Sequence, residues 1–354
     1  MLRQELVQFL DQLFQQKLFV LGDSDDYWAG IGVCGAYQVF MLVPRSGEPP
    51  WEIMRGAAPQ CDLAVLVVSG DGDIDGTMQA PHLDIPLVAV IDGEVSARAA
   101  TSLRHADIVV ATQKAPKPLR EAADLMCDDI HEGAALIARF TKTIQPGSVS
   151  PTPAAQNNIL EIVPADVEQP FDVHVLLDTL CAKSFVALKG AGALVLGAGQ
   201  VNGNPVMILA SQPAIDGGRI GVEDCYAAVR LIGLAQRLRL PVLVIQDTAG
   251  MTSEDGLPEA VEKLLKAWAT LDMPVVTLVA GRACGLAHVA LAGAGTRPTA
   301  LIAWPRAWIS LDDPQAGDKR ASVMTAAKGF GVNEVIDPRV TSDTISGWLT
   351  LWRD

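Results

Sequence analysis

The sequence contains no compact metal-binding motif. Its six cysteines are scattered, and no two of them form a Cys-x-x-Cys pair. The five histidines are equally dispersed. Without paired ligands no zinc site is expected, and isolated cysteines fit reduced thiols in a cytosol.

Long apolar runs are also missing. No stretch reaches the ~20 consecutive apolar residues that a membrane-spanning helix needs. Residues 1–20 do not fit a signal peptide, because Glu5, Asp11 and Lys17 interrupt the apolar residues. The apolar positions of this segment instead follow helical spacing. We therefore expect an N-terminal helix, no association with a membrane, and a cytoplasmic protein.

Positive charge is scarce. The chain has 27 Lys and Arg against 41 Asp and Glu, which gives a formal net charge of −14. This excess of negative charge argues against nucleic acid or an anionic membrane surface as the main partner. An acidic enzyme can still bind CoA esters through local basic groups.

Apolar residues and glycine are plentiful. The 354 residues are enough for two domains of ~150 residues each. The chain is 49% hydrophobic and has 31 glycines, so it can form large cores. The segment GSVSPTPAAQ, residues 147–156, has the composition of a linker. We therefore divide the chain into a first domain at 1–146, a linker at 147–160, and a second domain at 161–354.

Short apolar runs alternate with helical patterns, which predicts an α/β fold. Strands are expected at 63–68, 86–91, 108–111, 241–245, 275–279 and 299–304, two more within 27–43, and a hairpin at 192–199 and 205–210. Helices are expected at 93–103, 118–139, 171–180, 222–239, 257–271, 287–294, 321–328 and 340–352.

The two halves repeat one pattern. IPLVAVIDGEVSARAATSLRHADIVVA lines up with MPVVTLVAGRACGLAHVALAGAGTRPTALIA. At one constant spacing, Gly93 matches Gly281 and Ala97 matches Gly285. A repeat of this length predicts two similar domains rather than a solenoid.

The rest of the chain is organised around residues 274–305. An apolar strand is followed by the small-residue turn Ala-Cys-Gly-Leu-Ala, which opens a helix near Ala287. The first amides of a helix lack partners within it, and the helix dipole there favours negative charge. Such amides can hold a thioester enolate or another oxyanion. Close packing of a helix on a sheet also selects small residues, so both interpretations stand at this point.

Other strand ends carry candidate ligand groups. The strand before Asp247 ends in Asp-Thr-Ala-Gly, so Asp247 and Gly250 could face a ligand, although Asp247 could equally cap the next helix or form a turn. The strand before Gly70 ends in Ser-Gly-Asp-Gly, which places Gly70 and Gly72 in a similar loop. No Gly-Lys-Ser/Thr follows them, which excludes a P-loop.

Two further features have alternative interpretations. Gly217 and Gly218 could let a ligand approach the backbone closely, or they could form a plain turn. His288 follows the small-residue turn and could shuttle a proton, or it could be a packing residue.

At this point a family resemblance becomes visible. The segments ASQPAIDGGRIGVEDCYAAVRLIGLAQRLRLPVLVIQDTAGM, VVTLVAGRACGLA, IAWPRAWIS and GFGVNEVIDPRVT stand in this order between residues 171 and 341. In order and spacing they resemble the carboxyltransferase subunit of biotin-dependent acyl-CoA carboxylases, of the acetyl-CoA and propionyl-CoA type. The carboxyltransferase-like subunits of malonate decarboxylase are close relatives.

The resemblance implies two crotonase-like domains, each a twisted sheet flanked by helices. It also implies an active site between subunits, with acyl-CoA held by paired amides of the first domain and biotin by the matching pair of the second. In this chain the second pair falls at Leu286 and Ala287, just after Gly285, and the first pair at Ala97 and Arg98. A backbone amide survives a change of side chain, and Arg98 could fill the pocket or pair with a CoA phosphate.

The chain also departs from the family pattern. It is shorter than the usual subunit, its first half lacks the expected Gly-Gly-Ala run, and it has no zinc ribbon and no biotin-carrier Met-Lys-Met sequence. The resemblance therefore implies biotin on a separate carrier protein, a CoA thioester substrate, other carboxylase or decarboxylase subunits as partners, and an oligomer. Three functions remain open: acyl-CoA carboxyl transfer, biotin-independent decarboxylation of a malonyl thioester on an acyl carrier, and a non-catalytic supporting role.

Overall fold

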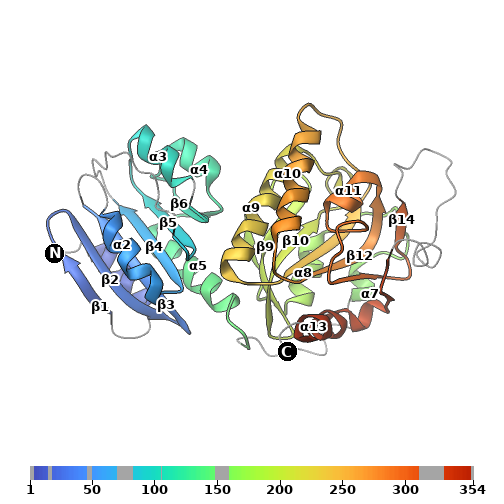
Figure 1. Ribbon diagram of the computed structural model, residues 1–354, viewed down its shortest axis with the longest axis horizontal. Coiled ribbons are helices and arrows are strands. Elements are labelled where there is room, and N and C mark those ends of the chain that lie inside the picture. The colour runs from blue at the N-terminus through green and yellow to red at the C-terminus, as the bar shows by residue number, and fades with distance from the viewer. Residues whose placement is uncertain are drawn as a thin grey trace. The chain divides into compact units, whose positions relative to one another are not determined.

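The structure is a computed structural model that describes residues 4–14, 18–45, 50–69, 83–104, 106–147, 159–310 and 331–351, with Arg98 described through its backbone alone. The chain divides into two compact units, Met1–Gln145 and Pro146–Asp354 (Figure 1). Each unit has its own sheet and its own core.

The described residues of the first unit form a seven-stranded sheet in the order β1-β2-β3-β4-β5-β6-β7. The strands are β1 Phe19–Asp23, β2 Tyr27–Cys34, β3 Tyr37–Pro44, β4 Leu63–Ser69, β5 Leu87–Asp92, β6 Ile108–Thr112 and β7 Leu125–Cys127. The helices are α1 Gln4–Leu13, α2 Trp51–Ala57, η1 Ala58–Gln60, α3 Ala97–Leu103, α4 Lys117–Ala122 and α5 Ile130–Thr143.

The second unit contains a sheet in the order β15-β13-β12-β11-β10-β9-β8, with β14 paired to β12. Its strands are β8 Val186–Leu188, β9 Leu194–Val201, β10 Asn204–Ser211, β11 Val242–Thr248, β12 Val275–Cys284, β13 Ala300–Ala303, β14 Trp308–Ser310 and β15 Glu334–Val335. Its helices are α7 Ile159–Ile162, α8 Val173–Leu180, η2 Asp216–Gly218, α9 Val222–Leu238, α10 Leu257–Thr270, α11 Gly285–Ala290, η3 Pro338–Val340 and α13 Thr341–Leu351.

The two sheets share one topology, which confirms the predicted repeat and the α/β class. In the first unit β1, β2 and β3 are antiparallel, and the strands from β3 to β7 run parallel. In the second unit β8, β9 and β10 are antiparallel, and the main path continues in parallel from β10 to β15. The helices α3 and α11 follow the corresponding strands β5 and β12.

Parallel strands buried on both faces account for the continuous apolar runs of the sequence. Every residue of β11 is buried, as is every residue of β5. In the second unit, α7, α8 and α13 contribute to the core on one face of the sheet. Helices α9 and α10 pack on each other, and α9 also contacts β9 and β10 (Figure 1).

One predicted helix is wrong. Residues 118–139 do not form a single helix but α4, the short strand β7 and α5. Asp124 stops the first helix because its Oδ2 accepts a hydrogen bond from the Val109 amide at 2.8 Å, which aligns β7 with β6. Asp129 starts the next helix by accepting from the amides of His131 and Glu132. The Asp-x-x-Glu spacing is a start signal for a helix that sequence reasoning missed.

The boundaries around the central stretch also need correction. The strand predicted at 275–279 continues as β12 to Cys284, because its last residues pair with β14, a short strand that was not predicted. The helix predicted at 287–294 is α11, which begins at Gly285 and ends at Ala290. The chain then turns through Ala292 at φ 54°, a left-handed conformation that ends a helix.

Some expectations lie outside the described residues. These are the loop with Gly70 and Gly72, residues 148–158 of the expected linker, and the helix expected at 321–328. Among the residues that are described, no helix is long and apolar enough to cross a membrane.

The outermost strand of the first sheet has an unusual surface. Strand β1 pairs with β2, and its side chains Phe19, Val20 and Leu21 are 68%, 49% and 43% exposed. The pairing register shifts between Val20 and Gly22, which marks a β-bulge.

Candidate functional site

The candidate site lies where β11 and β12 of the second unit end. These strands are parallel, and Thr248 is the register partner of Ala283. Strand β11 ends in Gln246, Asp247 and Thr248, and β12 leads through Cys284 directly into α11. Ligands of open α/β sheets bind at the carboxyl ends of the strands, so these residues are well placed for chemistry.

The turn into α11 depends on a glycine. Gly285 has φ 54°, a left-handed conformation that a β-carbon would strain. Ala287 is fully buried, whereas the side chain of Leu286 is 46% exposed. Cys284 supplies no side-chain cap, and the first amides of a helix have no acceptor within it. The amides of Leu286 and Ala287 therefore lie in the uncapped first turn of α11.

His288 is a buried, neutral residue whose ring is held by hydrogen bonds within the protein. Its ring is fully buried, and the Ala294 amide donates to Nε2 at 3.1 Å. The proton therefore sits on Nδ1, which donates to Gln246 Oε1 at 2.7 Å. Burial lowers the pKa of His288 to about 4. Both ring nitrogens are engaged by the protein, which supports the packing interpretation over the proton shuttle.

Asp247 belongs to a buried ion pair. Its Oδ1 accepts from Arg282 Nε at 2.9 Å and from the Arg282 amide at 3.2 Å. Burial raises the pKa of Asp247, and the Arg282 guanidinium opposes that shift. A β-carbon on Gly281 would lie 2.2 Å from Asp247 Oδ2, so only glycine fits beside this carboxylate. Asp247 therefore caps no helix. Through its bonds to Arg282 it holds the end of β12, which leads into the turn.

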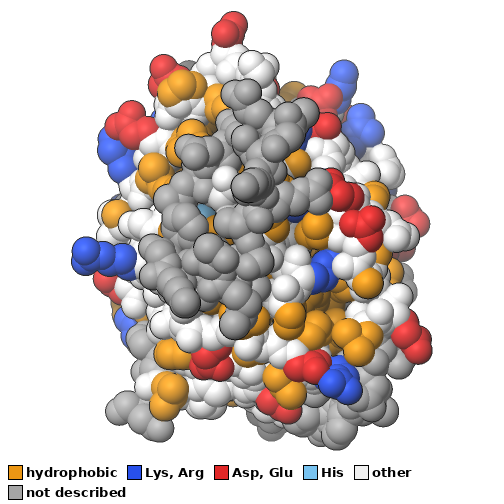
Figure 2. Space-filling model, turned by 90° about the vertical axis from the view of Figure 1, so that its right-hand side faces the viewer, with side chains coloured by type: hydrophobic (Ala, Val, Ile, Leu, Met, Phe, Trp, Pro, Cys, Tyr) orange, Lys and Arg blue, Asp and Glu red, His pale blue; other side chains and the backbone are white. Residues whose placement is uncertain are grey.

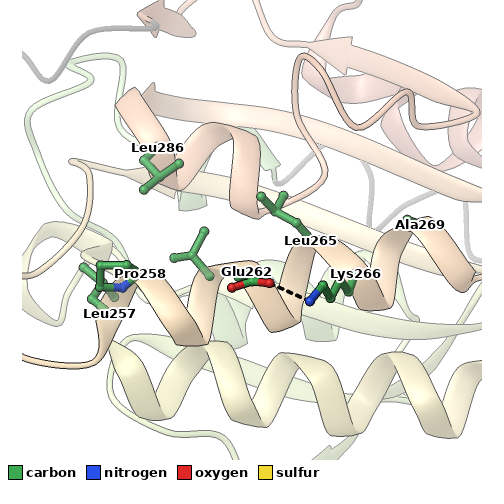
Figure 3. A pocket seen from close by; sticks show the side chains of 8 residues that line it. Leu257, Pro258, Glu262, Leu265, Lys266, Ala269 and Leu286 are labelled. Carbon is green, nitrogen blue, oxygen red and sulfur yellow. Dashed lines mark hydrogen bonds and ion pairs between the residues drawn. The ribbon is translucent and has the colours of Figure 1, made fainter.

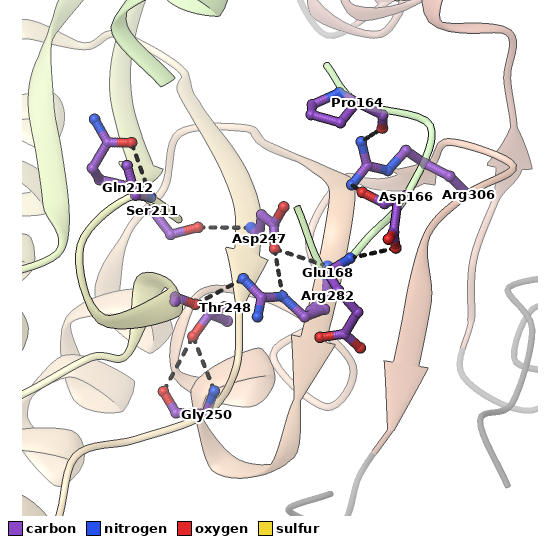
Figure 4. A network of polar contacts seen from close by, with 12 residues as sticks. Pro164, Asp166, Glu168, Ser211, Gln212, Asp247, Thr248, Gly250, Arg282 and Arg306 are labelled. Carbon is purple, nitrogen blue, oxygen red and sulfur yellow. Dashed lines mark hydrogen bonds and ion pairs between the residues drawn. The ribbon is translucent and has the colours of Figure 1, made fainter. Parts of the chain in front are cut away.

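The loop that contains Gly217 and Gly218, called the glycine loop here, is hydrogen-bonded to Arg282 of the same ion pair (Figure 4). Arg282 Nη2 donates to the Gly217 carbonyl at 3.1 Å, and the Ala249 amide donates to that carbonyl at 3.0 Å. Gly217 and Gly218 have φ 63° and 74°, and a β-carbon on Gly218 would lie 2.2 Å from the Asp247 carbonyl. The fold thus brings three predicted residues, Asp247, Gly217 and Gly218, together beside Arg282.

Gly250 completes the loop. It has φ 127°, and its amide and carbonyl both contact Thr248 Oγ1, at 3.2 Å and 3.1 Å. Its carbonyl also accepts from the Ile220 amide at 3.1 Å. The loop after β11 is therefore held to the segment that follows Gly218.

Sequence reasoning missed two arginines of this network. Arg282 was not a candidate, and neither was Arg306, which donates to the carbonyls of Pro164 and Asp166 (Figure 4). Burial lowers the pKa of Arg306. Arg306 Nε and Asp247 Oδ2 are buried and have no hydrogen-bond partner among the described residues. For Arg282 the available signal is a charged residue inside the apolar strand β12, which requires a buried partner; Arg306 lies between β13 and β14 and gives no such signal.

The first unit places its candidates differently. Ala97 and Arg98 open α3, but here Ser96 caps the helix, and its Oγ accepts from the Ala99 amide at 3.1 Å. At the end of β5 the buried carboxylate of Asp92 accepts from Thr112 Oγ1 at 2.9 Å and from Lys114 Nζ at 3.3 Å. The two corresponding turns are thus not equivalent, because one is capped and the other is not.

A groove runs beside the uncapped turn. It has a volume of about 520 Å³ and lies between α10 and the start of α11. Leu286 and Leu265 point toward it from its two sides (Figure 3).

Among the described residues, no group of three His, Cys, Asp or Glu side chains is placed to hold a metal ion. All six cysteines are buried thiols, and burial raises the pKa of Cys225 to about 12. On the face of the second unit drawn in Figure 2, described side chains of both charge signs are interspersed.

Comparisons with known proteins point to one family. Residues 126–316 match the sequence profile of the carboxyl transferase domain. The chain is 29% identical over 163 residues to a propionyl-CoA carboxylase carboxyltransferase subunit of Haloferax mediterranei, covering 44% of this chain and 32% of that protein. It is 27% identical over 223 residues to the biotin-dependent 3-methylcrotonyl-CoA carboxylase beta1 subunit of Mycobacterium tuberculosis, covering 58% of this chain and 40% of that protein. The match thus spans about a third of the length of the first curated relatives.

The fold has a close counterpart among solved structures. Transcarboxylase 12S, a hexamer crystallised with methylmalonyl-CoA, superposes with a TM-score of 0.82 at 17% identity, covering 99% of this chain and 90% of that chain. This likeness confirms the predicted crotonase-like fold.

Proposed function

Because the chain belongs to the carboxyl transferase domain family, we propose that it is an acyl-CoA carboxyltransferase subunit. It moves a carboxyl group to or from the α-carbon of an acyl thioester. The reaction passes through an enolate whose oxygen carries the developing negative charge. Stabilising that oxygen is the main task of the protein, because no protein nucleophile is needed.

The observation that carries the proposal is the uncapped turn after β12. Gly285, in its left-handed backbone conformation, turns the chain into α11. The amides of Leu286 and Ala287 provide two hydrogen-bond donors in the first turn of that helix. Donors fixed before the reaction cost no reorganisation when charge develops, and loss of one typically lowers kcat by ~10²–10³. The positive end of the helix dipole adds to the same effect.

The surrounding network keeps this turn in place. We assign Asp247 and Arg282 the role of positioning residues, because their buried pair links the ends of β11 and β12 to the glycine loop. Gly217, Gly218 and Gly250 shape that loop, and in this proposal the loop borders the ligand held at Leu286 and Ala287.

The first unit supplies the second ligand site in this proposal. The resemblance puts the paired amides of this unit at Ala97 and Arg98, which the repeat aligns with Gly285 and Leu286. The Arg98 guanidinium matches the chemistry of a CoA phosphate. Gly70 and Gly72 remain candidates for this ligand from the sequence alone.

The cofactor and partners follow from the relatives. Relatives are named as biotin-dependent, so we propose biotin attached to a carrier protein in trans, with a CoA thioester as substrate. Transcarboxylase 12S is a hexamer, and we expect this cytosolic subunit likewise to form an oligomer with other carboxylase subunits. A monomer at micromolar concentration, with no co-purifying partner, would contradict that expectation.

Avidin provides the test. The purified complex is incubated with a malonyl or methylmalonyl thioester and a biotinylated carrier, and carboxyl transfer is followed with and without avidin. We expect transfer that avidin blocks. Carbon dioxide release that ignores avidin identifies a biotin-independent decarboxylase instead. If neither reaction occurs and the chain raises the activity of a partner, it has a supporting role.

A further inference from the structure

The turns that follow β6 and β13 occupy the same place in the two sheets. Strand β6 pairs with β5 at Ala111 and Ile91, and β13 pairs with β12 at Ala303 and Val279. The constant spacing of the sequence repeat makes Ile91 the counterpart of Val279, so Ala111 is the counterpart of Ala303. The residues that follow these two alanines can therefore be matched one by one.

Residues 112–115 and 304–307 form turns of the same kind. In each turn the amide of the last residue donates to the carbonyl of the first, at 3.1 Å in the first unit and 2.9 Å in the second. The last residue is a buried alanine in both turns. The third residue is a cation in both, Lys114 in one turn and Arg306 in the other. Equivalent positions of the two units thus carry the same charge.

Each of these cations is near a buried carboxylate at the end of a neighbouring strand. Lys114 Nζ lies 3.3 Å from Asp92 Oδ2, and the Asp92 side chain is 2% exposed. Burial lowers the pKa of Arg306, and the Asp247 carboxylate is the charge that opposes this shift most. The Asp247 side chain is likewise buried. A buried carboxylate needs a partner, so both cations are held at the carboxyl ends of the strands, where ligands of α/β sheets bind.

The two cations differ in the groups that accept from them. Arg306 donates to the carbonyls of Pro164 and Asp166, so two peptide carbonyls of one irregular segment fill the position in the second unit (Figure 4). The Lys114 side chain is 60% exposed. An ammonium has three N–H donors, and among the described residues Asp92 accepts from one of them. The second unit therefore shows what this position takes, namely carbonyl oxygens carried on one chain.

We infer that Lys114 donates hydrogen bonds to the amide carbonyls of the pantetheine arm of the CoA thioester, at the strand ends of the first unit. This inference rests on the proposed function, which assigns the thioester to that unit. The pantetheine arm carries its amide carbonyls on one flexible chain, as the peptide segment does at Arg306. Asp92 holds the ammonium at the strand edge. Because Arg98 matches the phosphates in the proposed function, the two cations meet different parts of one ligand.

Calorimetric binding of CoA to the purified full chain tests the inference. Lys114→Met removes the ammonium and should raise the Kd of CoA about tenfold, which is the lower range for a hydrogen bond to a charged group because the side chain is partly exposed. Lys114→Arg should restore most of the affinity, because an arginine binds carbonyls at the equivalent position 306. The matched control is Lys117→Met, since Lys117 pairs with Glu121 on the surface of α4, and it should leave the Kd unchanged.

Salt separates a contact with the carbonyls from one with the phosphates of CoA. A neutral carbonyl is screened little, so the ratio of the Kd of Lys114→Met to that of the wild type should hold between about 0.05 M and about 0.5 M salt. A ratio that falls toward one in concentrated salt, or an equal loss of affinity for adenosine bisphosphate, which lacks the arm, overturns the inference in favour of a phosphate contact.

An unchanged Kd in Lys114→Met also overturns the inference and leaves the proposed function intact. If Lys114→Met folds poorly because Asp92 loses its partner, the additional change Asp92→Asn removes both charges of the pair and should show the same loss of affinity. A wild-type chain that binds no CoA contradicts the proposed function itself.

Discussion

Removal of the Arg282 side chain tests the buried pair at the centre of the site. Arg282→Met keeps the aliphatic volume but deletes the guanidinium, which donates to Asp247 and to the Gly217 carbonyl. The side chains of Asp247 and Arg282 are only 2% and 10% exposed, so solvent cannot replace the lost partner. Breaking a buried pair from one side typically costs about 3–5 kcal/mol of unfolding free energy.

The loss should depend on pH in a defined direction. Without the Arg282 guanidinium, burial loses its main opposing charge and only that of Arg306 remains, so the pKa of the Asp247 carboxyl rises further above the unfolded value. A folded pKa above the unfolded one means that the folded state prefers the proton. The variant should therefore be least unstable in mild acid and lose stability as pH rises through the folded pKa, at up to about 1.4 kcal/mol per pH unit.

Urea unfolding of the wild type and variant, each measured from mild acid to mild alkali, provides the assay. Arg339→Met is the control, because Arg339 also pairs with an aspartate, Asp337, but at the surface. Exposed pairs contribute little, so this control should change stability hardly at all. The additional change Asp247→Asn in Arg282→Met should recover part of the loss. Equal destabilisation by Arg282→Met and Arg339→Met would refute the buried-pair argument.

Three further predictions concern the turn and its supports. The pKa of His288 is about 4 in the folded state against 6.5 in the unfolded state. Its contribution to the free energy of unfolding is therefore complete above pH 6.5, and about 3 kcal/mol of it is lost as the pH falls to 4. His288→Asn should lack this part of the acid dependence when unfolding is measured in urea. Ala287→Val keeps the amide but crowds the turn, and it should lower kcat about tenfold or more while circular dichroism stays native; normal turnover would place the oxyanion site elsewhere. Gly218→Ala forces a β-carbon against the Asp247 carbonyl and should lower the melting temperature, whereas Gly233→Ala, with open space around it, should not.

Much of the fold could be predicted because local signals agreed with the tertiary structure. Asn202 and Gly203 have φ 49° and 78°, the conformation that a two-residue hairpin turn needs, and the sequence Asn-Gly already indicated it. Helix α9 begins where Asp224 accepts from the Gly221 amide at 2.9 Å, and its acidic first turn was visible in the sequence. The repeat predicted two sheets of one topology.

What escaped prediction depends on contacts between distant residues. Strands β7 and β14 are three residues each, too short for any periodicity to show, and their neighbours in the sheet define them. Arg306 reaches carbonyls near Pro164, far away in the sequence. Arg282 shows only that a charge lies inside an apolar strand, because nothing local reveals that its partner is Asp247. The small residues of the turn leave a local signature, whereas the partners of Arg282 and Arg306 leave none.

Strand β1 has a consequence for how the protein behaves at high concentration. An outer strand presents backbone donors and acceptors to other chains, and three exposed apolar side chains on β1 make such contact favourable. The net charge of −14 keeps copies apart, but only over the Debye length, which shrinks from about 10 Å at 0.1 M salt to about 3 Å at 1 M. Concentrated salt should therefore promote reversible clustering of the chain through this strand, and light scattering of a Val20→Lys variant should show less of it.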